Sequence, residues 1–108
     1  MKPIKAVAWE EEWETETGET QSKYKVQVAE IAKRSINKVR KSFTDWKDCG
    51  EGTNHRTKRH LLFFTREFDS KKEWRAWAKD FPYILYEETK RGKLKPMNAH
   101  AKKATECN

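Results

Sequence analysis

Apolar and polar residues alternate in two stretches near the start of the chain, residues 7–13 and 24–28. A period of two is typical of a strand with one buried face. Gly18 lies between the stretches and can adopt the positive φ that a tight turn requires. The pattern predicts an antiparallel hairpin, with Trp9 and Trp13 packed against a later helix.

The period changes to that of a helix after residue 28. Apolar residues recur every three to five positions up to Trp46, which predicts an amphipathic helix over about residues 29–47. Gly50 and Gly52 follow it and predict a polar loop that extends to Lys58.

The second half of the chain has clearer boundaries. The apolar centre of residues 60–68 predicts an inner strand. Ser70, with Glu73 three positions later, is a helix-capping pattern, and apolar residues at 74, 77, 78 and 81 share one helical face. Pro82 ends this helix, and residues 83–86 predict a further strand.

These elements give the order β-β-α-β-α-β and predict a small α+β domain over residues 1–89. We expect a sheet of about four strands with two helices on one face. In residues 90–108 the large apolar side chains are Leu94 and Met97. The segment contains six Lys or Arg and one acidic residue, Glu106. This composition predicts a flexible basic C-terminal tail.

Length and composition are those of one small domain. The chain has 108 residues with 38% charged residues, and its 5 Trp, 5 Phe and 3 Tyr supply the apolar area for a core. No run of about 18 apolar residues and no secretory signal pattern is present, so we expect a cytoplasmic protein. Cys49 and Cys107 are 58 positions apart and are expected to be free thiols.

Charge is distributed unevenly along the sequence. Residues 1–19 carry two Lys and six Glu, a charge of 2 − 6 = −4, whereas residues 20–108 carry 22 Lys or Arg and 11 Asp or Glu, a charge of +11. We expect two separate docking surfaces of opposite sign, because a one-signed surface attracts a partner of the other sign.

The basic surface favours a phage-type or mobile-element protein that binds nucleic acid without catalysis. Lys and Arg neutralise phosphates and release counterions, and nearby aromatic rings stack on unpaired bases. Basic side chains on a helix also occur simply as a solvated face. The candidate residues on the first helix, the following loop and the tail are Lys33, Arg34, Lys38, Arg40, Lys41, His55, Arg56, Lys58, Arg59, Lys90, Arg91 and Lys93.

An acidic hairpin offers an alternative, a protein inhibitor of a host complex that processes nucleic acid or acts in defence. Alternation places Glu10, Glu12 and Glu14 on one side at a spacing of roughly 6.6 Å, near the phosphate step of one strand. An exposed Trp9 or Trp13 would anchor such a partner. The same charges would also keep a strand edge from pairing with another chain.

Catalysis and metal binding have weaker support. His55 and His60 with the neighbouring Arg and Lys have the composition of a metal-independent ribonuclease site, but no nucleophile accompanies them. Cys49 and the two histidines match no zinc spacing, and no Gly-rich phosphate loop is present. We expect a non-enzymatic protein without metal or cofactor, and a small metal-independent ribonuclease is the third alternative.

Overall fold

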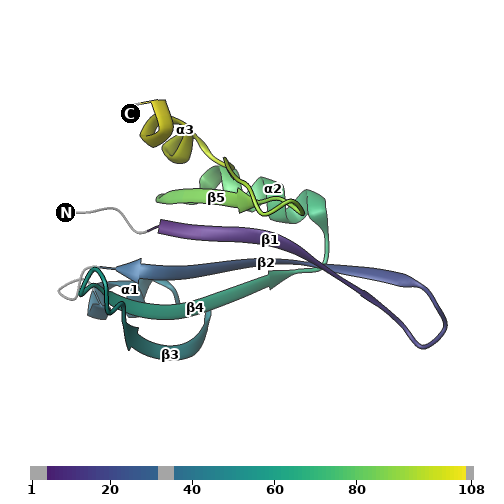
Figure 1. Cartoon of the computed structure of the whole chain (residues 1–108), viewed down its shortest axis with the longest axis horizontal. Coiled ribbons are helices and arrows are strands. Elements are labelled where there is room, and N and C mark those ends of the chain that lie inside the picture. The colour runs from purple at the N-terminus through teal and green to yellow at the C-terminus, as the bar shows by residue number, and fades with distance from the viewer. Residues whose placement is uncertain (1–4, 32–35, 107–108) are drawn as a thin grey trace.

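The computed structural model describes residues 5–31 and 36–106, and these form an α+β fold (Figure 1). The elements follow one another along the chain as β1 (Lys5–Glu14), β2 (Thr20–Ile31), α1 (Ile36–Ser42), β3 (Lys47–Thr53), β4 (His60–Phe68), α2 (Lys71–Asp80), β5 (Ile84–Glu88), β6 (Leu94–Pro96) and α3 (Ala99–Glu106). The predicted class is confirmed, but the described residues form six strands and three helices rather than about four and two.

All six strands belong to one sheet in the order β3-β4-β2-β1-β5-β6. Neighbouring strands are antiparallel except β1 and β5, which are parallel. The predicted hairpin of β1 and β2 is confirmed, and Gly18 in its turn has a φ of 83°.

The hairpin extends beyond the rest of the sheet. β1 pairs with β5 only over residues 5–8, and β2 pairs with β4 only from Tyr24 onward. The remaining part, residues 11–23, forms a two-stranded projection that we call the arm (Figure 1).

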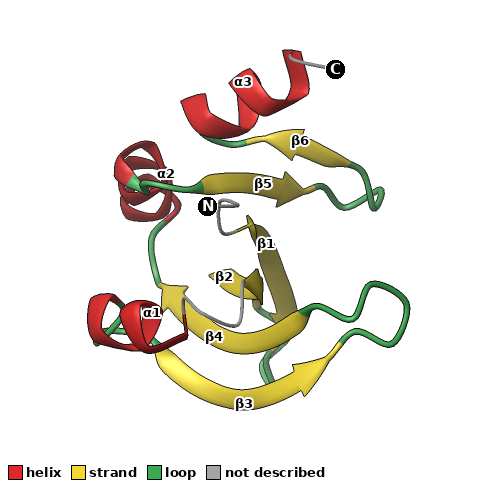
Figure 2. Cartoon of the chain, turned by 90° about the vertical axis from the view of Figure 1, so that its left-hand side faces the viewer, coloured by secondary structure: helices red, strands yellow, loops and turns green. Residues whose placement is uncertain are grey.

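One face of the sheet is covered by α1 and α2 (Figure 2), and the core lies between them. Small residues of β1, Ala6 and Ala8, are fully buried there, as is Trp74 of α2. Nine aromatic residues belong to this layer or pack against it: Tyr24, Phe43, Trp46, Phe64, Phe68, Trp74, Trp77, Phe81 and Tyr83. The α3 helix packs against β5 and β6 at the sheet edge (Figure 2).

The predicted burial of Trp9 and Trp13 is wrong. Ala6 and Ala8 face the helices, and strand alternation therefore directs Trp9 and Trp13 to the opposite side of the sheet. Trp13 is 39% exposed and neither tryptophan belongs to the core. The two small side chains belong to the same buried cluster as the indole of Trp74.

The predicted helix over residues 29–47 is also wrong in its extent. β2 continues to Ile31, α1 spans only Ile36–Ser42, and β3 begins at Lys47. The apolar stripe is real, because Ile31, Val39 and Phe43 are all buried in the core. These residues reach it from a strand, a helix and the segment after the helix, which together imitate a helical period.

Two segments predicted to lack regular structure contain it. The polar loop predicted from Gly50 to Lys58 begins as strand, because β3 continues to Thr53 and pairs with β4 along the sheet edge; only residues 54–58 form a turn. Residues 90–108, predicted as a flexible tail, contain β6 and α3. Asn98 explains how this segment is held: it is 5% exposed, its Oδ1 accepts hydrogen bonds from the Leu85 and Ala101 amides, and its Nδ2 donates to the carbonyl oxygens of Phe81 and Tyr83.

The strand and helix predicted for residues 60–81 are confirmed. β4 has the predicted bounds, and α2 begins after Ser70, whose Oγ accepts a hydrogen bond from the Glu73 amide at 3.4 Å. α2 ends at Asp80, two residues before Pro82. Within residues 5–31 and 36–106, no helix combines the length and apolar character needed to span a bilayer.

Candidate functional site

The face of the sheet opposite α1 and α2 carries no helix among the described residues (Figure 2), and we call it the open face. The strand register and the alternation with buried positions identify the residues of the open face. They are Val7, Trp9, Glu11 and Trp13 of β1; Lys23, Lys25 and Gln27 of β2; Leu61, Phe63, Thr65 and Glu67 of β4; and Ile84 and Tyr86 of β5. None of these residues is buried. Such a face is usually polar when it contacts water.

Four of the thirteen aromatic residues lie on the open face: Trp9, Trp13, Phe63 and Tyr86. The other nine pack in or on the core. Among the described residues, none of the four contacts another aromatic ring. Trp13 is 39% exposed, and Trp9, Phe63 and Tyr86 are partly buried. Rings that lie outside the core in this way are more informative than core rings, because core packing does not account for them.

Sequence reasoning missed Phe63 and Tyr86 as site residues. Both lie in continuous apolar runs, which are equally compatible with a strand covered on two faces. The alternation within β4, where Leu62 and Phe64 are buried but Leu61 and Phe63 are not, becomes visible only once the helices are known to lie on one side.

Charged residues on the open face neutralise one another. Lys25 lies 2.6 Å from Glu11 and 3.4 Å from Glu67, and Lys23 lies 3.2 Å from Glu67. The hydrogen bond with Glu11 raises the pKa of Lys25, and the hydrogen bond from Lys23 lowers the pKa of Glu67. This ladder stabilises the cross-strand pairing and leaves little net charge in the middle of the face.

Two exposed basic turns flank the open face. The right-handed twist of the sheet lifts diagonal corners to the same side, and Figure 2 shows the β3–β4 turn and the β5–β6 turn on the side away from α1 and α2. The first turn carries His55, Arg56 and Lys58, and the second carries Arg91 and Lys93, all exposed.

Local hydrogen bonds shape the β3–β4 turn. The Asn54 Oδ1 accepts from the Arg56 and Thr57 amides at 3.0 and 3.3 Å, and the Lys58 amide donates to the Asn54 carbonyl at 2.8 Å. Lys58 has a φ of 61°, the left-handed conformation that closes the turn. The backbone and the Asn54 side chain make these bonds, which leaves the side chains of Arg56 and Lys58 available to a ligand.

The β5–β6 turn is closed by Gly92, whose φ is 81° and whose amide donates to the Thr89 carbonyl at 2.8 Å. Lys90 at this turn is engaged within the chain, at 2.5 Å from Glu12 and 3.8 Å from Glu10. The hydrogen bond between Lys90 and Glu12 lowers the pKa of Glu12 and raises the pKa of Lys90.

The structure does not unite the three predicted basic regions. α1 lies on the helix-covered side of the sheet (Figure 2), where Lys38 and Lys41 are exposed. Arg40 is paired with Glu51 and lies 3.9 Å from Asp48, so it connects α1 to β3. Lys33 and Arg34 lie outside the described residues. The turns therefore replace the helix as the main basic feature beside the open face.

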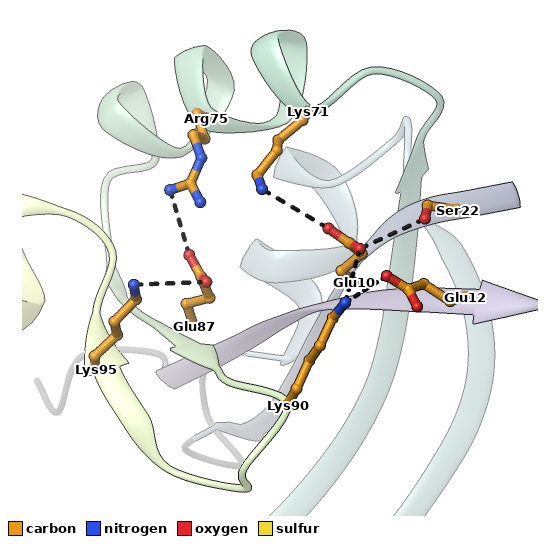
Figure 3. Close-up of polar contacts among 8 residues, drawn as sticks. All are labelled: Glu10, Glu12, Ser22, Lys71, Arg75, Glu87, Lys90 and Lys95. Carbon is orange, nitrogen blue, oxygen red and sulfur yellow. Dashed lines mark hydrogen bonds and ion pairs between the residues drawn. The ribbon is translucent and has the colours of Figure 1, made fainter. Parts of the chain in front are cut away.

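A charged cleft of about 440 Å³ lies between α2, β1 and β5–β6. In Figure 3, Lys71 and Arg75 point from α2 toward Glu10 and Glu87, at 3.9 and 3.4 Å, while Lys95 lies 3.9 Å from Glu87. Its carboxylates and cations alternate, so this cleft has no dominant sign.

These pairs correct the predicted separation of charge. Glu10 and Glu12 do share one side of β1, as expected, but that side faces α2 and the β5–β6 turn, and Lys71 and Lys90 neutralise them. Only the end of the arm, residues 13–22, stays purely acidic: it carries Glu14, Glu16 and Glu19 and no Lys or Arg.

The residues of the ribonuclease hypothesis are not gathered into one site. His55 is exposed in the β3–β4 turn, whereas the Nε2 atom of His60 is buried and lies 3.5 Å from the Glu51 carboxylate. In the described part of the chain, no group of three or more His, Cys, Asp or Glu side chains has the geometry of a metal site. Cys49 is an exposed free thiol, and Cys107 lies outside the described residues.

No protein-family model matches this chain, and searches among curated proteins and among solved structures found no significant match.

Proposed function

We propose that this protein binds nucleic acid across the open face, with the β3–β4 and β5–β6 turns contacting phosphates. The observation that carries the proposal is the position of the two turns. Each presents exposed cations, and both lie on the side of the sheet that no described helix covers (Figure 2). A polyanion crossing the sheet from one turn to the other would neutralise cations at both ends and release counterions.

The body of the open face supports this proposal. Its lysines are already paired with Glu11 and Glu67, so phosphate contacts would concentrate at the turns, where Arg56, Lys58 and Arg91 are exposed. Arginine and lysine that contact phosphates position a nucleic-acid backbone without reading its sequence. We therefore expect affinity that depends strongly on salt and weakly on base sequence.

Salt titration with a fluorescently labelled oligonucleotide tests the proposal. The logarithm of the binding constant should fall linearly with the logarithm of salt concentration, by about 0.7 for each phosphate contacted on a single strand. The double variant Arg56→Glu, Lys58→Glu should weaken binding at least tenfold at low salt, an estimate of roughly 1.4 kcal/mol, and should flatten the slope.

A matched control changes the same charge on the other side of the molecule. Lys72 and Lys79 are exposed on α2, and Lys72→Glu with Lys79→Glu alters the net charge equally. We expect a much smaller loss for this control. Equal losses in the two variants would show that only net charge matters, and no binding of any oligonucleotide at low salt would overturn the proposal.

The arm supports a second candidate, docking to a protein that handles nucleic acid. Trp13 is 39% exposed on a projecting ribbon whose end is purely acidic, and an exposed tryptophan beside charges is typical of an interface anchor. Trp13→Ala should then abolish capture of a protein partner from nuclease-treated lysate while leaving the fold unchanged. A partner that is lost from the parent protein on nuclease treatment would instead support direct nucleic-acid binding.

A further inference from the structure

We infer that the ligand of the open face is single-stranded nucleic acid, whose bases stack on Trp9, Trp13, Phe63 and Tyr86. This inference rests on the proposed function and specifies its substrate class. It starts from the division of the aromatic residues: nine pack in or on the core, and the remaining four all emerge on the one face that no described helix covers.

Three of these rings follow a line along β5 and β1, in which Tyr86 and Trp9 lie in the body of the sheet and Trp13 lies on the arm. Tyr86 is paired with Val7, and Trp9 is the next residue of β1 on the same face, so their side chains are diagonal neighbours at about 7–8 Å. Trp13 is four residues beyond Trp9, about 13 Å farther along the strand. Rings in such a series offer successive flat surfaces to the bases of one strand.

Each basic turn has a ring close to it. Phe63 lies in β4, four residues after the end of the β3–β4 turn, and Tyr86 lies three residues before Thr89 in the β5–β6 turn. The Lys5 ammonium also lies 5.5 Å from the centre of the Tyr86 ring. Phosphate contacts and stacking surfaces are thus adjacent at both ends of the face, as binding to an unpaired strand requires.

Polar side chains between the rings suit base edges. Gln27 lies on the open face opposite Val7 and next to Thr65. Amide and hydroxyl groups both donate and accept hydrogen bonds, so they can contact any base without strong preference. A duplex gains little from these features, because its base faces are covered by neighbouring pairs.

The experiment compares one strand of about 12 nucleotides with the duplex of the same sequence, at the same salt concentration. We expect the single strand to bind at least tenfold more tightly and to quench tryptophan fluorescence. The double variant Trp9→Leu, Tyr86→Leu should lose about tenfold in single-strand affinity for each ring removed and should keep its duplex affinity. Thermal unfolding of each variant reports whether the fold is intact.

A conservative variant separates stacking from shape. Trp9→Phe with Tyr86→Phe retains a ring at each position and should restore most of the single-strand affinity. The quenching test uses the parent protein without substitution. The double variant Trp9→Phe, Trp13→Phe should still bind the single strand but should lose most of the fluorescence quenching, because the remaining Trp46, Trp74 and Trp77 lie on the other face of the sheet.

The outcomes distinguish base stacking on the rings from the more general proposal that the open face binds nucleic acid. Equal affinity for duplex and single strand, with no effect of the leucine variant, would overturn the stacking inference and leave the nucleic-acid proposal intact. Failure to bind either oligonucleotide would overturn both. If sedimentation then showed self-association that the leucine variant abolishes, the rings would belong to an interface between copies of this chain.

Discussion

Asn98 and Ala8 decide much of this fold, and neither stands out in the sequence. Asn98 satisfies backbone groups from β5 and from the first turn of α3, which allows a polar segment to pack without large apolar side chains. Ala8 is fully buried on a strand whose tryptophans dominate any hydrophobicity count. The sequence predicted the strand correctly but inverted its faces, since alternation gives a period without saying which set is buried.

The orientation of β1 leads to a stability prediction. Ala8→Leu should destabilise the protein by about 1–3 kcal/mol, because the added side chain meets the layer filled by Trp74. Trp9→Leu, one residue along, should cost less than about 1 kcal/mol, because the ring lies outside the core. Urea unfolding followed by circular dichroism measures both values.

The informative result is which of the two substitutions, Ala8→Leu or Trp9→Leu, lowers the free energy of unfolding more. A larger loss for Trp9→Leu than for Ala8→Leu would mean that β1 presents its tryptophans to the helices, and the open face would then lose its central rings. Val7→Ala serves as a control on the open face, where Val7 is only partly buried, and should resemble Trp9→Leu in its small cost.

At the scale of elements, predictability followed the amount of apolar area that each element buries. The hairpin, β4 and α2 have strong patterns because they contribute Val26, Leu62 and Trp74 to the core. β3 is exposed along nearly its whole length, β6 has three residues, and α3 buries only Ala101. Hydrogen bonding to a neighbouring strand forms β3 and β6, and Asn98 holds the first turn of α3. Neither kind of bond produces a hydrophobic period in the sequence.

The candidate site was predictable in its ingredients but not in its arrangement. The basic residues of the two turns were identified from composition, whereas their position beside the open face follows from the twist and strand order of the sheet. The basic helix was misplaced for a related reason. Its predicted cations divide among α1, a pair with Glu51 on β3, and positions outside the described residues.

The link between the arm and the β5–β6 turn gives a pH-dependent prediction. Lys90 lowers the pKa of Glu12, so the interaction is complete above the ordinary carboxyl range and is lost as pH falls through the pKa of Glu12 in the folded protein. Lys90 has a raised pKa, so its contribution is lost only as pH rises through that value. The pair should therefore hold the turn against the arm at neutral pH.

Carboxyl titration by NMR measures this link. Glu12 should titrate below its ordinary range in the parent protein, and Lys90→Met should move its pKa upward, as should high salt. Lys93→Met is the control in the same turn, where no ion pair joins Lys93 to a described carboxylate, and it should leave Glu12 unchanged. A Glu12 pKa that is the same in all three proteins would exclude the contact in solution. Because both side chains are exposed, global stability should change little.

At the scale of the whole molecule, charge is mixed over most of the surface but not at the end of the arm. Glu10, Glu11 and Glu12 are matched by lysines from other elements, whereas residues 13–22 carry no cation. A polyanion on the open face would therefore meet favourable charge at the turns and repulsion toward the arm. The acidic end of the arm would keep a strand from extending beyond Trp13, and a protein partner with a basic surface would prefer that acidic end.

The last prediction separates these two roles. Replacing the arm-end carboxylates by Glu14→Gln, Glu16→Gln and Glu19→Gln should raise single-strand affinity about threefold to tenfold at low salt, because three repelling charges are removed. The gain should disappear at about 1 M salt, where the screening length falls to about 3 Å. Fluorescence anisotropy at both salt concentrations measures the difference.

A control removes three carboxylates from the helix-covered side by Asp45→Asn, Glu73→Gln and Asp80→Asn, all exposed. Equal gains in the two triple variants would mean that the arm acts only through net charge. If the arm variant gained nothing for nucleic acid and lost a protein partner that the control retained, the acidic end would be a docking element for that protein. The arm would then be an attractive contact in its own right, and the inhibitor hypothesis would replace the nucleic-acid proposal for this end of the molecule.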